Sequence, residues 1–272
     1  MIIDVQPAAG GIITKEQLGQ IFDKAWRNEY KGITLYGYTS KEKHWSYVDA
    51  SDEYGPFEKL QVAVNPKIVY NDPSPDYNPE RLEGYFAAVK EKLKSLPYKV
   101  EAAESAGNAV TKAKQIAELT HEFDKDAIIV LAADKPMSGR LVWDALICTG
   151  LKWGDGDLFH WENNRHNYGD DQLFSVWTTT DPGYFLPENI EQMGPGNLVF
   201  GFSIPRNADP ENVYEAMFNA VKYCQKRLGG QILNRDGKSF DMAKEQATLT
   251  EMVKKLKDKG IVPGSDNALI NF

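Results

Sequence analysis

The sequence predicts an α+β protein built from two tandem domains, and three observations lead to this prediction. First, the segment NPERLEGYFAAVK, which begins at Asn78, has a counterpart, DPENVYEAMFNAVK, which begins at Asp209. Second, Phe86 and Phe218 are 132 positions apart, much further than the roughly 20–50 residues of a solenoid repeat. Third, both halves show the same order of short strand-like segments and longer helical ones. The 272 residues also fit two domains of roughly 100–200 residues each.

The elements of the first half follow from the period of its apolar residues and from helix-start signals. Strands are expected at residues 2–5, 33–38, 45–48, 60–64 and 99–102, and helices at residues 14–26, from Asn78 onward, and at 109–123. The first helix is predicted by an apolar stripe that includes Leu18, Phe22 and Trp26. Asn78 is a typical N-cap, and Pro79 follows at the first helical position, where its missing N–H costs nothing.

The second half repeats this order. Strands are expected at residues 128–131, 157–161, 173–178, 198–204 and 231–233, and helices at 139–149, 210–228 and 242–257. Gly229 and Gly230 end the long helix. Each half therefore reads βαβββαβα, which is typical of an antiparallel or mixed sheet with helices on one face. The predicted domains are residues 1–125 and 126–259, followed by a tail at 260–272.

Charge and hydropathy argue against nucleic-acid binding and against a membrane-spanning segment. A net charge of -8 disfavours nucleic acid, because binding to phosphates depends on clustered Lys and Arg. The longest apolar run, residues 127–133, is far shorter than the roughly 20 residues of a membrane span. The first residues, MIIDVQPAAGG, lack the pattern of a signal peptide. We therefore expect a cytoplasmic protein without a membrane segment.

Several motifs of the second half resemble the C-terminal domain of ZipA, the bacterial division protein that binds FtsZ. They are GDGDLFHW from Gly154, LFSVWTTTDPGYF from Leu173, GPGNLVFGFSIP from Gly194, and the long helix that ends in LGGQIL. The resemblance covers about residues 126–259. The first half is linked to the family by the internal repeat, as a diverged duplicate.

The resemblance implies binding without catalysis. In that family, the bare sheet face forms a shallow apolar groove that takes the C-terminal tail of FtsZ, a groove mode of peptide recognition. Strand alternation places these residues on the corresponding face: Ile128, Val130, Leu158, His160, Ser175, Trp177, Thr179, Val199 and Gly201. Their neighbours should face the helices: Ile129, Leu131, Phe159, Phe174, Val176, Phe200, Phe202 and Ile204. Alternatively, this face is simply solvated or packs against another domain, although its apolar content exceeds what a solvated face needs.

Two departures from the family bear on the partner. The family often has a small residue where this chain has Trp177, and an aromatic one where it has Gly201. Trp177 is expected to fill the space above Gly201, which would reshape the groove and leaves a different peptide as an alternative to the FtsZ tail. The family's N-terminal membrane anchor and long linker have no counterpart in this sequence, so a tethering role is not implied.

The first half and the tail leave alternatives open. By analogy with the repeat, the open face of the first half should include Ile2, Asp4, Leu35, Trp45 and Leu60. The two sheets could offer two peptide sites, which would raise avidity, or could pack face to face. The apolar tail residues are expected either to dock, as a strand or within a groove of the same chain, or to be disordered.

No cofactor, metal site or catalytic residue is predicted. The sequence lacks HExxH, GxSxG, phosphate-loop and EF-hand patterns, and GPGNLVFG precedes a strand instead of a helix. The densest polar stretch could in principle bring six side chains to one cation: Asp155, Asp157, His160, Glu162, His166 and Asp170. A polar hairpin loop is the simpler interpretation. The second functional hypothesis is a small-ligand binder or enzyme with its site at the interface of the two copies.

Overall fold

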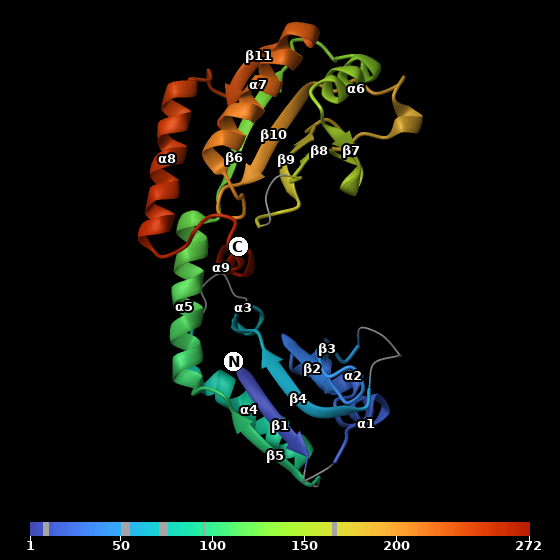
Figure 1. Ribbon diagram of the computed structural model, residues 1–272, viewed down its shortest axis with the longest axis vertical. Helices are drawn as coiled ribbons and strands as arrows, with labels where there is room; N and C mark the ends of the chain where they lie inside the picture. Colours follow the sequence, from blue (N-terminus) through green and yellow to red (C-terminus); the bar gives the residue numbers. More distant parts are fainter. Residues whose placement is uncertain (8–10, 50–54, 71–75, 95, 165–167) are drawn as a thin grey trace. The chain divides into compact units, whose positions relative to one another are not determined.

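The protein, analysed as a computed structural model, divides into two compact units (Figure 1). Unit 1 comprises Met1–Glu118 and unit 2 comprises Leu119–Phe272, so the division falls within helix α5 (Ala106–Phe123). The structure describes residues 1–7, 11–49, 55–70, 76–94, 96–164 and 168–272. Each unit has its own sheet and its own apolar core, in agreement with the predicted α+β class.

Unit 1 contains a five-stranded antiparallel sheet in the order β3-β2-β4-β1-β5. Its strands are β1 (Ile2–Pro7), β2 (Ile33–Thr39), β3 (Trp45–Tyr47), β4 (Phe57–Val64) and β5 (Tyr98–Ala102). Its helices, besides α5, are α1 (Lys15–Ile21), α2 (Lys24–Glu29), α3 (Pro66–Val69) and α4 (Pro79–Leu93).

The single helix predicted at residues 14–26 is wrong, because the chain forms α1 and α2 there. Thr14 caps α1 through a capping box with Gln17. Asp23 then caps α2, since its carboxylate accepts from the backbone N–H of Trp26 at 2.9 Å. A second cap within the apolar stripe starts a new helix while Phe22 and Trp26 both remain buried.

Unit 2 contains a six-stranded antiparallel sheet in the order β11-β6-β10-β9-β8-β7. Its strands are β6 (Asp126–Ala132), β7 (Lys152–Trp153), β8 (Phe159–Glu162), β9 (Gln172–Trp177), β10 (Asn197–Ser203) and β11 (Gln231–Asn234). Its helices are α6 (Gly139–Cys148), α7 (Pro210–Leu228), α8 (Met242–Asp258) and α9 (Asp266–Asn271), with 3₁₀ turns at Asp155–Asp157 and Pro187–Asn189. The first of these turns replaces the start of the strand predicted at 157–161.

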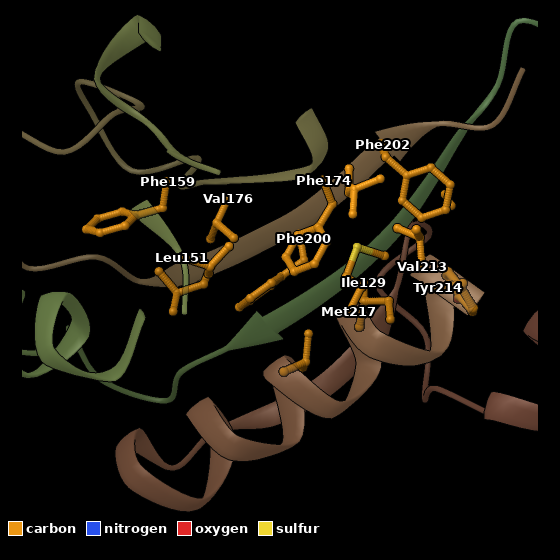
Figure 2. Close-up of a cluster of buried hydrophobic side chains, with 14 of the residues drawn as sticks. Ile129, Leu151, Phe159, Phe174, Val176, Phe200, Phe202, Val213, Tyr214 and Met217 are labelled. Carbon is orange, nitrogen blue, oxygen red and sulfur yellow. The ribbon is translucent and has the colours of Figure 1, made fainter. Parts of the chain in front are cut away.

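The core of unit 2 lies between the sheet and helix α7 (Figure 2). All eight strand residues predicted to face the helices are buried: Ile129, Leu131, Phe159, Phe174, Val176, Phe200, Phe202 and Ile204. They pack with Val213, Tyr214 and Met217 of α7. Because strand side chains alternate between faces, this burial leaves the intervening residues on the opposite side of the sheet.

The long helices α4 and α7 begin similarly but are capped differently. Asn78 caps α4 by accepting from the backbone N–H of Glu80 at 2.9 Å. Asp209 holds the N-cap position of α7 without a side-chain bond to the backbone, because its carboxylate accepts from the Asn212 side chain at 2.8 Å. At the other end of α7, Gly229 has a φ of 79°, a conformation that favours glycine.

Three neighbouring strands of each sheet pair in the same way, β4-β1-β5 in unit 1 and β10-β6-β11 in unit 2. Ile3 opposes Val62 as Ile129 opposes Phe200. Likewise, Val5 opposes Val100 as Leu131 opposes Ile232. The outer strands differ, since β2 lies beside β4 with β3 at the edge, whereas β9 lies beside β10 with β8 beyond it.

The C-terminal tail docks on unit 2 as a helix, and of the alternatives left open by the sequence, the strand and the disordered end are wrong. Ala268 of α9 is fully buried and belongs to the core of unit 2. The N–H of Gly264 donates to the carbonyl of Pro205 at 2.9 Å, and Arg206 Nη1 donates to the carbonyl of Leu269 at 3.2 Å. Gly264 has a φ of 75°, and a Cβ there would lie 2.6 Å from the Cα of Ala208.

Removing residues 266–272 is expected to lower the free energy of unfolding by about 1–3 kcal/mol, because Ala268 would no longer cover the core. Urea unfolding followed by circular dichroism measures the change. As a control, Ile270→Ser should change stability by no more than about 0.5 kcal/mol, since Ile270 is 83% exposed. Unchanged stability of the truncated chain would contradict the docking.

Candidate functional site

Strand pairing brings most of the predicted binding residues of unit 2 together. One cross-strand row runs through Val130, Val199 and Trp177, and the next runs through Ile128, Gly201, Ser175 and His160. Leu158 and Thr179 lie immediately outside the paired strands, so the register alone does not place them. We call the whole set the unit 2 sheet face: Ile128, Val130, Leu158, His160, Ser175, Trp177, Thr179, Val199 and Gly201.

The unit 2 sheet face is partly covered by its own side chains. A Cβ on Gly201 would lie 2.4 Å from Cδ1 of Ile128 and 2.8 Å from Cη2 of Trp177. The indole therefore fills the space above the glycine, as predicted. Val199 is consequently buried, whereas Ile128, Val130 and Trp177 remain half-buried. The result is an apolar surface with a ridge at Trp177.

His160 is held by two hydrogen bonds and is 6% exposed. Its Nε2 lies 2.7 Å from the carbonyl oxygen of Asp155, which can only accept, so Nε2 carries a proton. Its Nδ1 lies 2.8 Å from the hydroxyl of Ser175. In the neutral imidazole, Nδ1 accepts from that hydroxyl. A catalytic triad would need a carboxylate on the other ring nitrogen of His160, but that nitrogen meets the main-chain carbonyl of Asp155. His160 and Ser175 therefore do not form a triad with a carboxylate, and His160 instead joins the turn at Asp155 to β9.

The polar stretch after Gly154 does not gather around one point. Among the described residues, no group of three or more His, Cys, Asp or Glu side chains is arranged to hold a metal ion. His166 lies outside the described residues. Asp157 adopts a φ of 57° at the 3₁₀ turn, and its carbonyl accepts from the N–H of Phe185 at 2.8 Å.

The remaining acids of this stretch have separate partners. Glu162 forms an ion pair with Lys152, and this hydrogen bond lowers the pKa of the Glu162 carboxyl. Asp170 binds Arg206 in a bidentate manner, at 2.9 Å from Nε and 2.5 Å from Nη2. These contacts give Glu162 and Asp170 a structural role.

A polar hollow of about 350 Å³ adjoins the unit 2 sheet face at Ser175 and Gly201. Asp155, Asp170 and Asp171 line it, together with Gln172. The sequence analysis did not select Asp171 or Gln172, although the run GDDQ was a signal of concentrated polarity. The unit 2 sheet face is thus apolar in its centre and acidic at this border.

In unit 1, the predicted open face is correct in part. Ile2 is half-buried and Trp45 is exposed, but Leu35 and Leu60 are 4% and 1% exposed and belong to the core. Their assignment is wrong because Leu35 opposes Val62, which places it on the face of β1 and β4 that the helices cover. Asp4 lies on the other face, where it accepts from Gln61 Nε2 at 3.0 Å.

The open face of unit 1 carries three tyrosines that the sequence analysis missed: Tyr36, Tyr38 and Tyr47. Tyr36 opposes Tyr47, and Tyr38 opposes Trp45. The alternation in LYGYT and WSY was the signal that could have identified them. The pKa of Tyr36 is raised, mainly by a hydrogen bond with Tyr47 and to a smaller extent by partial burial.

We expect Gly201→Ala to lower the free energy of unfolding by about 1–3 kcal/mol, because its Cβ would overlap Ile128 and Trp177. In the Trp177→Ala background, the same substitution should cost less, since the indole is absent. A double-mutant cycle by urea unfolding measures this coupling. Equal costs in both backgrounds would show that the indole does not occupy the space above Gly201.

Comparisons with known proteins match unit 2. Residues 127–251 fit the family model of the ZipA C-terminal FtsZ-binding domain. The Cell division protein ZipA of Colwellia psychrerythraea is 27% identical over 125 residues, which cover 46% of this chain and 32% of the relative. Its counterpart in Shewanella loihica is 28% identical over 126 residues, covering 45% and 37%. The Cell division protein ZipA of Shewanella frigidimarina is 30% identical over 109 residues, which cover 39% of this chain and 30% of the relative.

These matches confirm the resemblance predicted from the motifs of the second half. The chain spans about a third of the length of these curated relatives. In the described part of the chain, no helix is both long and apolar enough to cross a membrane. Residues 127–251 are therefore similar, over most of unit 2, to the C-terminal domain of the ZipA family.

Proposed function

We propose that the unit 2 sheet face binds a short peptide without catalysing a reaction, and that this peptide is the C-terminal tail of FtsZ. The protein would then act in cell division. The observation that carries the proposal is the half-buried apolar patch of Ile128, Val130 and Trp177, within a segment that matches an FtsZ-binding family model.

The composition of the face supports a peptide ligand. When a partner removes half-buried apolar side chains from water, the complex is stabilised by about 25 cal/mol per Å² of apolar area buried. Trp177 is the central anchor of this surface, because tryptophans in the middle of an interface often dominate its binding energy. A peptide helix or extended segment laid along the row of Val130, Val199 and Trp177 would contact Trp177 and Val130 together.

The polar groups near the face support binding in preference to catalysis. Both ring nitrogens of His160 are engaged, and Ser175 faces Nδ1. Glu162 and Asp170 form ion pairs with Lys152 and Arg206. In this arrangement the polar residues position the strands and turns around the apolar patch.

We also infer that unit 1 is a diverged copy of the unit 2 domain, with domains at residues 1–125 and 126–259. Ile3 is the cross-strand partner of Val62 in unit 1 as Ile129 is of Phe200 in unit 2, and this correspondence supports the inference. The repeated helices α4 and α7 give independent support from the sequence. The copies share the pairing of three strands, whereas the side chains on their open faces differ. Equal binding by both units is therefore not expected.

A fluorescently labelled FtsZ C-terminal tail peptide should bind the full chain saturably, with a dissociation constant in the micromolar range, in anisotropy titrations. Trp177→Ala and Leu158→Asp should each weaken binding by tenfold or more, because they remove an apolar anchor and add a charge to the surface. The matched control is Leu141→Asp on α6, which is also apolar and is 51% exposed. Its affinity should stay unchanged.

Two outcomes would contradict the proposal. Absence of binding at high micromolar protein would remove the FtsZ tail as the partner. Equal binding by the Trp177 and Leu158 variants, with circular dichroism confirming that they are folded, would remove the unit 2 sheet face as the site.

A further inference from the structure

The β2–β3 hairpin of unit 1 presents four aromatic side chains on one face. We call Tyr36, Tyr38, Trp45 and Tyr47 the aromatic hairpin face. They alternate with Leu35, Gly37 and Ser46 along the two strands, so strand geometry directs all four to the same side. This surface belongs to unit 1, outside the segment that matches the ZipA family model.

The four rings form two pairs. The ring centroids of Tyr36 and Tyr47 are 4.7 Å apart with an interplanar angle of 36°. Those of Tyr38 and Trp45 are 5.6 Å apart with an angle of 64°. The pairs are two residues apart along each strand, which corresponds to about 7 Å. The hairpin therefore carries two ring pairs next to each other on one face.

The stability of the hairpin does not explain why these rings are exposed to solvent. Trp45 is 42% exposed and Tyr47 is 54% exposed. Cross-strand aromatic pairs contribute only about 0.2–1 kcal/mol each to a sheet, and the opposite side of the hairpin already buries Leu35 and Val48. Contiguous exposed aromatic side chains of this kind mark interaction surfaces more often than singly scattered ones do.

The charges around the rings disfavour a strongly charged partner. The nearby bases Arg27 and Lys43 form ion pairs with Asp49 and Glu58. Lys59 Nζ lies 5.9 Å from the ring centroid of Tyr38. A single strand of nucleic acid would stack on such rings, but it also requires a continuous positive surface, which paired charges do not provide.

We infer that the aromatic hairpin face binds a proline-rich segment of another protein in the polyproline II conformation. Proline rings are uncharged and pack against Tyr and Trp ring faces, and this helix is already ordered before it binds. Its backbone carbonyls are free of internal hydrogen bonds and can accept from the Tyr hydroxyls.

Anisotropy titration of a labelled oligoproline peptide with the full chain tests this inference. Saturable binding is expected, and Trp45→Ala and Tyr47→Ala should each weaken it by tenfold or more. Tyr223→Ala on α7 is the matched control, because this tyrosine is 39% exposed and lies in unit 2; it should leave the affinity unchanged. A Gly-Ser peptide of equal length should not bind. Circular dichroism verifies that every variant is folded.

Three results would overturn the inference. They are absence of oligoproline binding at millimolar peptide, loss of binding in Trp177→Ala instead of Trp45→Ala, and binding of oligothymidylate in place of the peptide. FtsZ-tail binding measured on the same Trp45 and Tyr47 variants should be unchanged. The outcome for unit 1 is thereby separated from the outcome for the unit 2 sheet face.

Discussion

The packing of one sheet face against helix α7 is the constraint on which the rest of unit 2 depends. Phe200 at the centre of β10 and Ile129 beside it on β6 are completely buried against Met217 of α7. Burying side chains of this size contributes about 1.5–3 kcal/mol each, which makes this face the main apolar contribution to the stability of the unit. Once these residues are fixed under the helix, the strand period fixes the other face as well.

The free side of each sheet is a consequence of that packing, and its chemistry differs between the units. In unit 2, Trp177 lies over Gly201 and leaves a ridged apolar surface beside an acidic hollow. In unit 1, the corresponding side is aromatic at the β2–β3 edge and polar at its centre, where Asp4 meets Gln61. The same pairing of three strands thus supports two surfaces of different chemistry.

Sequence alternation predicted the buried side of the unit 2 sheet correctly, since all eight residues expected to face the helices are buried. Leu35 and Leu60 were misplaced because their side was inferred from the repeat. Their side depends on pairing with Val62 and Val5, and the strands beside β4 and β10 do not correspond in the two sheets. The aromatic residues of β2 and β3 were missed for the same reason, although the segments LYGYT and WSY alternate clearly.

The sequence by itself determined the α+β class, the order of most strands and helices, and the buried side of the unit 2 sheet. These features depend on local periodicity, caps and glycine stops, which are properties of neighbouring residues. Tertiary structure alone decided that the tail packs as helix α9, that both nitrogens of His160 are occupied, and that Glu162 and Asp170 take separate partners. Each of these depends on contacts between residues from different elements, such as Arg206 with Asp170, which no local pattern specifies.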